Sequence, residues 1–324
     1  FTKSAQFPFH FWLPNAMSAP TPVSAFLHAA TMVKAGVYLL MRFHPLLGGT
    51  QLWMTTLVLV GGITALWGAV QALAPSDLKR VLAYTTMMAL GILIMFLGGQ
   101  ATPALTAATT FLLVHALYKA SLFLAAGSID HQTGTRLLDR LGGLWRAMPL
   151  TALAVAAASM SMAGFPLFFG FIGKEIMYKG ALTETVYPGF ATTIALLSNA
   201  LMTGVAGTIL LGVFFGRRPT ALAAVREVPW TMRFGPSIMG GLTILFGIVP
   251  WWVSANMVQP AVLAFHPARE EIHLKLFHGF NTPLLLSVAT LTLGGLIYST
   301  RHHIRIHVAT LRQRLPVTSQ GIYQ

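Results

Sequence analysis

Long apolar stretches dominate this chain, and short polar segments separate them. A helix needs about 18 to 20 mostly apolar residues to cross the hydrocarbon core of a bilayer. Eight stretches approach or exceed that length, at residues 22–42, 52–74, 81–99, 103–128, 149–172, 189–215, 236–253 and 281–299. Segments of about ten residues with alternating polarity, the pattern of an outer-membrane barrel, do not recur. The pattern predicts an all-α, polytopic bundle of transmembrane helices.

Glycine and proline interrupt this pattern in two places. The stretch SMAGFPLFFGFIGKEIMYKG has helical periodicity but contains Gly164, Pro166, Gly170 and Gly173. Backbone groups freed by such a break are tolerated at membrane depth only where they line a hydrated cavity. We expect a discontinuous (broken) helix here, unwound at Gly170 and Gly173 beside Lys174. The opening segment, bracketed by Pro8 and Pro14, looks like the end of another broken helix.

The composition agrees with a membrane protein. Hydrophobic residues make up 55% of the chain and charged residues 9%, against about 25% charged residues in a soluble domain. Cysteine is absent, which excludes disulfides, iron–sulfur clusters and cysteine zinc sites, and we expect no cofactor. The net charge of +13 lies in short connections between spans, so membrane lipid is expected to contact it and nucleic acid is not.

Lys and Arg are distributed unequally along the connections. If the spans alternate in direction, 13 of these 21 residues lie on one side, 4 on the other, and 4 at or within apolar segments. The positive-inside rule assigns the richer side to the cytoplasm. We therefore expect a multi-pass protein of the inner (plasma) membrane of the cell, with its basic connections in the cytoplasm.

The segment RHHIRIHVATLRQR, from Arg301 to Arg314, predicts a helix that lies on the membrane surface. Ile304, Val308 and Leu311 recur at helical spacing with basic residues between them, as in helices that bind anionic lipid. Three histidines in this segment have no carboxylate or cysteine nearby, so we interpret them as part of a solvated basic face: His302, His303 and His307.

The four lysines at or within the apolar segments are Lys3, Lys34, Lys119 and Lys174. A lysine at the centre of a span costs about 2.5 to 3.5 kcal/mol on insertion scales, so it marks a functional site by default. Reaching to the interface is an alternative for Lys3 and Lys174. Lys34 and Lys119 lie too deep in their spans for that. Because burial destabilises a charged ammonium, such lysines can gain and lose a proton and form a relay.

Two histidines accompany these lysines. His115 and Lys119 are four residues apart in FLLVHALYKASLFLAAG, so they share a helix face about 6 Å apart and can exchange a proton directly or through one water. His28 and Lys34 are six residues apart, about 9 Å along a helix and about 120° around it. Their contact would require a π-bulge or a bridging water.

Carboxylates are scarce near the apolar stretches. Glu175 follows Lys174 and is either its counter-ion or the first acid of the next loop, and both interpretations stay open. Asp130 is the other acid close to a span, so Asp130 and Glu175 are the two local, weak candidates for binding Na+. Capping and interfacial anchoring account for the charged residues before residues 81–99, namely Asp77, Lys79 and Arg80.

Five segments carry a resemblance to a known family: KSAQFPFHFWLPNAMSAPTPVSAFLHAATMVKAGVYLL, SDLKRVLAYTT, HALYKASLFLAAGSIDHQTGTR, LGGLWRAMP and GFPLFFGFIGKE. In this order they resemble the antiporter-like proton-translocating family, which includes the large membrane subunits of respiratory complex I. That resemblance covers residues 1–185. MVKAG, IDHQTGTR and LKLFHGFNTPLLLSVATLTLGGLIY are most similar to the A subunits of Mrp-type multisubunit Na+/H+ antiporters, which extends it to about residue 300.

The resemblance implies two broken helices and an axis of lysine and histidine along the membrane plane. A glutamate that the family pairs with the first lysine would lie upstream of this chain. Carried over by motif, the proton-transfer residues are the first broken-helix lysine Lys3, its neighbours His28 and Lys34, the central pair His115 and Lys119, and the second broken-helix lysine Lys174 with Glu175 beside it.

The resemblance also implies a function. The chain would be a subunit of a hetero-oligomeric antiporter that exchanges protons for Na+ or another monovalent cation, driven by the proton-motive force, and would not be an enzyme. One alternative is a proton-pumping subunit of complex I or a related membrane-bound hydrogenase. Another, of a different class, is a structural scaffold whose lysines pair with lipid or neighbouring subunits.

Three regions follow from these patterns. Residues 1–185 would be the C-terminal part of the antiporter-like module, residues 186–300 additional transmembrane helices, and residues 301–324 a cytoplasmic amphipathic tail or linker. The chain opens with neither a methionine nor the basic region of a signal peptide. We therefore expect it to be a piece of a longer protein.

Overall fold

The computed structural model of the protein describes residues 1–183, 186–267, 271–277 and 279–314. Within these ranges the regular structure is helical, and one isolated antiparallel β-bridge joins Asp77 to Leu137. Six of the described helices are long and apolar enough to cross a membrane, or seven if a bent pair counts as one span. The prediction of an all-α, polytopic fold is confirmed.

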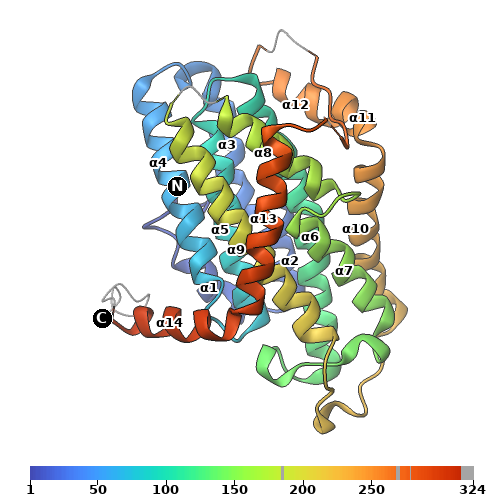
Figure 1. Ribbon diagram of the computed structural model, residues 1–324. Helices are drawn as coiled ribbons and strands as arrows, with labels where there is room; N and C mark the ends of the chain where they lie inside the picture. Colours follow the sequence, from blue (N-terminus) through green and yellow to red (C-terminus); the bar gives the residue numbers. More distant parts are fainter. Residues whose placement is uncertain (184–185, 268–270, 278, 315–324) are drawn as a thin grey trace.

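The long helices lie side by side, whereas α14 lies across one end of the bundle and the short α11 and α12 lie at the other (Figure 1). Short helices open the chain and follow α10: α1 (Trp12–Asn15), α2 (Thr21–Ala25), α11 (Pro250–Val253) and α12 (Gln259–Leu263). The longer helices are α3 (Met32–Leu47), α4 (Gln51–Gln71), α5 (Leu78–Leu97), α6 (Thr102–Thr133), α7 (Pro149–Ala163), α8 (Phe169–Leu182), α9 (Pro188–Phe214), α10 (Trp230–Ile248), α13 (Thr282–Ser299) and α14 (Arg301–Arg314).

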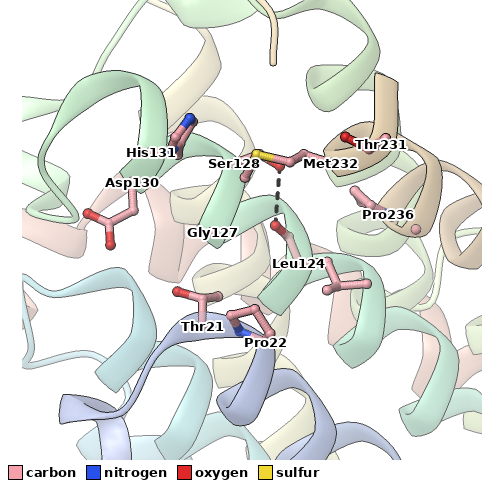
Figure 2. Close-up of a pocket in the computed structure, with 11 residues that line it drawn as sticks. Thr21, Pro22, Leu124, Gly127, Ser128, Asp130, His131, Thr231, Met232 and Pro236 are labelled. Carbon is pink, nitrogen blue, oxygen red and sulfur yellow. Dashed lines mark hydrogen bonds between the residues drawn. The ribbon is translucent and has the colours of Figure 1, made fainter. Parts of the chain in front are cut away.

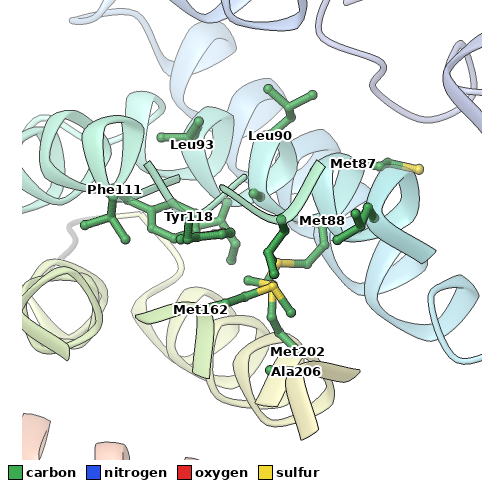
Figure 3. Packing of buried hydrophobic residues seen from close by; sticks show 14 of the residues in the cluster. Met87, Met88, Leu90, Leu93, Phe111, Tyr118, Met162, Met202 and Ala206 are labelled. Atoms are coloured by element: carbon green, nitrogen blue, oxygen red, sulfur yellow. The ribbon is translucent and has the colours of Figure 1, made fainter. Parts of the chain in front are cut away.

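α5 lies at the centre of the bundle. Every residue from 81 to 97 is buried, and the helix is apolar all round, as a helix surrounded by other helices should be. α4 packs closely against it, because a Cβ atom on Gly61 would lie 2.4 Å from the amide nitrogen of Met95. Figure 3 shows the core where side chains of α5, α6, α7 and α9 gather. The buried Lys119 of α6 packs against this centre.

The first span contains a π-helical turn. α2 is followed by π-helical residues 26–30 and then by α3, and together they form one apolar stretch from Thr21 to Leu47. At the junction Thr31 leaves helical geometry, with φ −124° and ψ −89°, and its hydroxyl donates to the Phe26 carbonyl at 3.0 Å. The extra residue in this turn changes the angle between His28 and Lys34 around the helix.

The predicted broken helix is confirmed, but its break lies elsewhere. α7 ends at Ala163, Gly164 adopts φ +72°, and α8 begins at Phe169 and continues to Leu182. The predicted end at residue 172 and the predicted unwinding at Gly170 and Gly173 are therefore wrong. Gly170 lies inside α8, where a Cβ atom would lie 1.7 Å from the Ser161 carbonyl oxygen. That glycine permits close packing, whereas Gly164 permits the left-handed backbone.

The predicted span at 236–253 is also shifted. α10 begins at Trp230 and ends at Ile248, and the chain then bends by 96° into the α11–α12 segment. Pro250 begins the new helix, where its missing N–H costs no hydrogen bond. Residues 250–263 therefore lie across the end of the bundle.

The opening segment is less helical than predicted. Residues 1–10 form turns, and the helical turns before Pro20 are α1 and a 3-10 helix at residues 16–18. This segment packs against α3, since a Cβ atom on Gly36 would lie 3.0 Å from Ser4. Pro8 supplies no backbone N–H, so a continuous helix through it would lack a hydrogen bond.

Most basic connections gather at one end of the bundle. Arg136 lies 3.2 Å from Asp77, and the Gly143 amide donates to the Phe215 carbonyl at 3.1 Å, so three connections meet there. α14 lies at the same end (Figure 1). Its helical form is as predicted, with Ile304 and Val308 half-buried, while the side chain of Leu311 lies outside the described residues, as does Arg269.

Candidate functional site: lysines and histidines along α6

Lys119 lies at the centre of the candidate site. Its side chain is fully buried between α6 and α5, and its ammonium group donates to the Leu82 carbonyl at 2.8 Å and to the Thr85 hydroxyl. Both partners are neutral. The charge of a protonated Lys119 is therefore compensated by dipoles alone among these contacts, and the hydrogen bonds to them orient the nitrogen in either protonation state.

His115 lies one turn before Lys119 on α6, as the spacing predicts, and is also fully buried. Its ring meets Tyr118 edge to face, with centroids 5.4 Å apart. Among the described residues, neither ring nitrogen of His115 has a hydrogen-bond partner. Buried imidazoles that serve only packing are normally hydrogen-bonded. This arrangement therefore favours a role in proton transfer.

His28 reaches the same face of α6 through Phe123. Its ring stacks on Phe123 with centroids 4.6 Å apart, and the Lys119 nitrogen lies 5.9 Å from the centroid of that same ring. His28 is fully buried, and within the described part of the chain its ring nitrogens also lack hydrogen-bond partners. His28 and Lys119 thus both approach the ring of Phe123.

Lys34 contacts α6 on the N-terminal side of His115. It is mostly buried, and its ammonium group donates to the Leu112 carbonyl at 3.2 Å, three residues before His115. A π-helical turn, one of the two means by which His28 and Lys34 could make contact, is present, but Lys34 contacts α6 at Leu112 and His28 contacts it at Phe123. From residue 112 to residue 123 the row extends about 16 Å along α6. We call His28, Lys34, His115 and Lys119 the α6 row.

Lys174 lies on α8 beside the helix break. Its side chain is 2% exposed and donates to the carbonyl of Ala163, the last residue of α7. α8 packs on α6, where a Cβ atom on Gly173 would lie 3.0 Å from Val114, the neighbour of His115. Lys174 therefore does not reach for an interface, and it belongs to the same buried region as the α6 row.

Glu175 is 3% exposed and lies in the middle of α8, so its interpretation as the first acid of a loop is wrong. It lines a surface depression of about 320 Å³ together with Lys179 and the start of α13. Neighbouring residues on a helix point about 100° apart, so Glu175 and Lys174 face different surroundings.

Asp130 lies at the opposite end of the molecule from this depression. It is in the last turn of α6, 4.0 Å from Arg136, and lines a pocket of about 540 Å³ with His131, Thr21 and Ser128 (Figure 2). The two candidate carboxylates for Na+ are thus not brought together.

Lys3 lies apart from the α6 row and is exposed on the opening turns.

Lys79 is a buried residue that the sequence analysis assigned to the interface. Its side chain is fully buried and donates to the Ala19 carbonyl at 2.5 Å, just before α2. The neighbouring Arg80 is exposed, as expected of an anchor, and its amide is capped by Asp77 at 3.1 Å. The apolar residues on the same helix face as Lys79 could have predicted that its side chain is buried.

Comparisons with known proteins identify a family and several similar proteins. Residues 1–212 match the family described as NADH:quinone oxidoreductase/Mrp antiporter, TM. The chain is 43% identical over 309 residues to a probable A/B subunit of a K(+)/H(+) antiporter from Rhizobium meliloti (strain 1021), covering 94% of this chain and 31% of that protein. It is 37% identical over 323 residues to the A1 subunit of a Na(+)/H(+) antiporter from Staphylococcus aureus (strain Newman), covering 92% and 40%.

A solved structure of similar shape is the Mrp complex from Dietzia sp. DQ12-45-1b. The match has a TM-score of 0.89 and 37% sequence identity, and it covers 98% of this chain and 34% of the matched chain. The chain therefore spans less than half the length of each of these relatives.

Proposed function

The chain belongs to the NADH:quinone oxidoreductase/Mrp antiporter membrane family, and we propose that it is the proton-translocating part of a subunit in a monovalent cation/proton antiporter. Relatives named as Na+/H+ and K+/H+ antiporter subunits support this over more than nine tenths of the chain. The observation that carries the proposal is the α6 row, in which two lysines bonded to neutral partners alternate with two imidazoles that have no hydrogen-bond partner in the described part of the chain.

The row moves protons by mutual repulsion. Two unit charges about 6 Å apart repel each other by about 3 kcal/mol at an effective dielectric constant of about 20. A proton that arrives on His115 therefore favours release from Lys119, and a proton on Lys34 favours release from His115. Because carbonyl and hydroxyl dipoles hold both ammonium groups in place, each transfer needs little rearrangement.

Lys174 loads or releases protons at the non-cytoplasmic side. The basic connections gather at the opposite end of the bundle from the depression beside Glu175. The positive-inside rule assigns that basic end to the cytoplasmic side of the plasma membrane. The break at Gly164 leaves backbone carbonyls near Lys174, where they can solvate an ammonium group.

The exchanged cation is monovalent, and its route lies mainly outside this piece or in partner subunits of a hetero-oligomeric complex. A row of lysines repels cations, and the local carboxylates Asp130 and Glu175 lie at opposite ends of the bundle. We expect Asp130→Asn and Glu175→Gln to keep their dependence on Na+ or K+ concentration. Loss of that dependence in either variant would place the cation route here.

Cation-induced proton movement in inverted membrane vesicles tests the function. Each unit charge that crosses 100 mV is worth about 2.3 kcal/mol, so the proton gradient can drive cations outward only if the two movements are coupled. We expect a pH-sensitive dye to report proton movement when Na+ or K+ is added without an electron donor. The family name also includes NADH:quinone oxidoreductases, so pumping that requires an electron donor would instead favour a redox-driven subunit.

A further inference from the structure

A second group of buried polar side chains lies between α8, α9 and α13, where the α6 row does not reach. Thr203 of α9 donates to the Ala163 carbonyl at 3.3 Å, the same oxygen that accepts from Lys174. Thr203 also donates to the Asn199 carbonyl at 2.9 Å. This group therefore begins at the ammonium group of Lys174 and continues along α9.

Tyr178 connects this group to α13. It lies four residues after Lys174 on α8, so the two share a helix face, and its side chain is fully buried. Its hydroxyl interacts with the side chain of Asn199 and forms a hydrogen bond with the Thr290 hydroxyl. Thr290 is itself fully buried and donates to the Leu286 carbonyl at 2.8 Å. Tyr178 and Thr290 therefore link α8 to α13 through their hydroxyl groups.

Two further polar atoms at this interface lack a hydrogen bond within the described ranges. Among the described residues, the amide nitrogen of Asn199 and the hydroxyl of Ser287 are buried without a hydrogen bond. Asn199 is 3% exposed and Ser287 1%, and Ser287 lies three residues from Thr290 on α13. Unsatisfied buried polar groups are rare in native proteins and point to water or to a functional requirement. In a membrane interior they indicate an interface that water enters.

The outward end of this interface opens at the depression beside Glu175. Lys179, which directly follows Tyr178, lines that depression together with Asn281 and Pro283. Asn281 caps α13 and Pro283 lies in its first turn. Along α13 the polar positions then follow in order from this depression: Ser287 and Thr290. Polar side chains thus recur at intervals between the depression and Lys174, and Tyr178 and Thr290 are joined by a hydrogen bond.

We propose that the Tyr178–Thr290 hydrogen bond is a gate that controls proton passage between Lys174 and the depression beside Glu175. The inference rests on the proposed function. A permanently open route would dissipate the proton gradient, and a single hydrogen bond between neutral groups can close it and still open during transport. α13 lies beyond the residues 1–212 that match the family, so the gate ties the proton-translocating module to a helix outside it.

Passive proton leak tests the gate in the full complex. We would prepare vesicles that contain the complex, impose a pH gradient without Na+ or K+, and follow its decay for Tyr178→Phe and Thr290→Val. Both variants keep the shape of the side chain and remove the hydrogen bond. Loss of one neutral hydrogen bond shifts an equilibrium by about two- to tenfold, so we expect the leak to rise within that range. The double variant should leak no more than either single one.

Matched controls exist on the same helix. Thr292→Val makes the same chemical change at a residue whose hydroxyl donates to carbonyls of α13 itself, and Thr290→Ser keeps the hydroxyl, so both should leak as the unmodified complex does. A leak unchanged in both gate variants, with normal cation exchange, would overturn the gate and leave the proposed function intact. Loss of exchange without added leak would also overturn it, because the pair would then conduct protons. Absence of exchange in the unmodified complex would refute the proposed function itself.

Discussion

The side chain of Lys174 passes over Gly164, where a Cβ atom would lie 2.3 Å from its Cε atom. Gly164 also adopts φ +72°, a conformation that costs a residue with a side chain about 1 to 2 kcal/mol. One glycine therefore permits both the helix break and the approach of the ammonium group to the Ala163 carbonyl. Without it, Lys174 would have to leave this position.

Gly164→Ala should accordingly lose most cation-induced proton movement while the complex still assembles. The strained backbone and the displaced lysine both lower the rate of proton movement. Gly241→Ala is a suitable control, because that glycine has no neighbour within 4 Å of the added Cβ atom. Initial rates of dye response in vesicles, with assembly followed on a native gel, measure the effect. Normal exchange in Gly164→Ala would show that the position of Lys174 is not critical.

Lys174→Arg should also fail, for a different reason. Guanidinium keeps its proton at any working pH, so the variant retains positive charge but cannot release a proton. Loss of a positioned proton-transfer group typically lowers a rate by about 100-fold or more. Lys179→Arg makes the same change at an exposed position on α8 and should remain active. If Lys174→Arg exchanged at the normal rate, Lys174 would supply only fixed charge.

Lys119 distinguishes a transporter from a scaffold. We expect Lys119→Ala and the better space-filling Lys119→Met to assemble normally and to lose exchange by about 100-fold or more. A scaffold needs the packing of α6 but not a titratable group, so it would tolerate both changes. Assembly on a native gel and exchange in the same vesicles decide between the two. Retained exchange in either assembled variant would favour the scaffold.

The sequence predicts the parts of this site that depend on a single helix. The length of the apolar runs predicts most of the spans, although α7 and α10 end before their predicted ends, and the spacing of His115 and Lys119 predicts their common face. The meeting of Lys34 with Leu112 requires α3 to pack on α6, which no local pattern specifies. The break was misplaced because glycine serves two purposes here: Gly164 permits a left-handed backbone and Gly170 permits close packing.

Lys79 shows a related limit. A charge count treats every lysine near the end of a span alike, whereas the fold buries Lys79 and exposes Arg80 beside it. The difference arises from the direction of each side chain around α5. Only the placement of the chain before α2 reveals the Ala19 carbonyl as the partner of Lys79.

Lys79→Ala should therefore reduce exchange, whereas Arg80→Ala should not. Lys79 positions the start of α2, the segment that leads to His28, and does not itself join the row. A hydrogen bond from a charged group contributes about 1.5 to 3 kcal/mol. Its loss should therefore lower the population of molecules with α2 in the correct position by about tenfold or more. Initial rates of exchange compare the two neighbours. Equal rates of exchange in both variants would show that Lys79 acts only as an interfacial anchor.

His266 predicts a dependence on pH at the end of the bundle opposite the basic connections. It follows α12, and its Nε2 atom lies 3.3 Å from the Thr102 hydroxyl at the start of α6. Its ring lies 6.0 Å from that of His44. Burial, and then the neighbouring His44, lower the pKa of His266 below its usual value near 6.5. The contacts with Thr102 and His44 thus favour the neutral form of His266 and hold it against the bundle.

Acidification should loosen this attachment. Because the pKa is lowered in the folded state, the detached segment binds protons more readily, so the attachment is fully stable above about pH 6.5 and weakens as the pH falls below that value. Hydrogen exchange of the backbone amides in α12 should speed up between about pH 6.5 and 5 after correction for intrinsic rates. His266→Gln, which keeps a polar partner for Thr102 but cannot take up the proton, should remove that increase. The same rise in the variant would assign the pH dependence to another group.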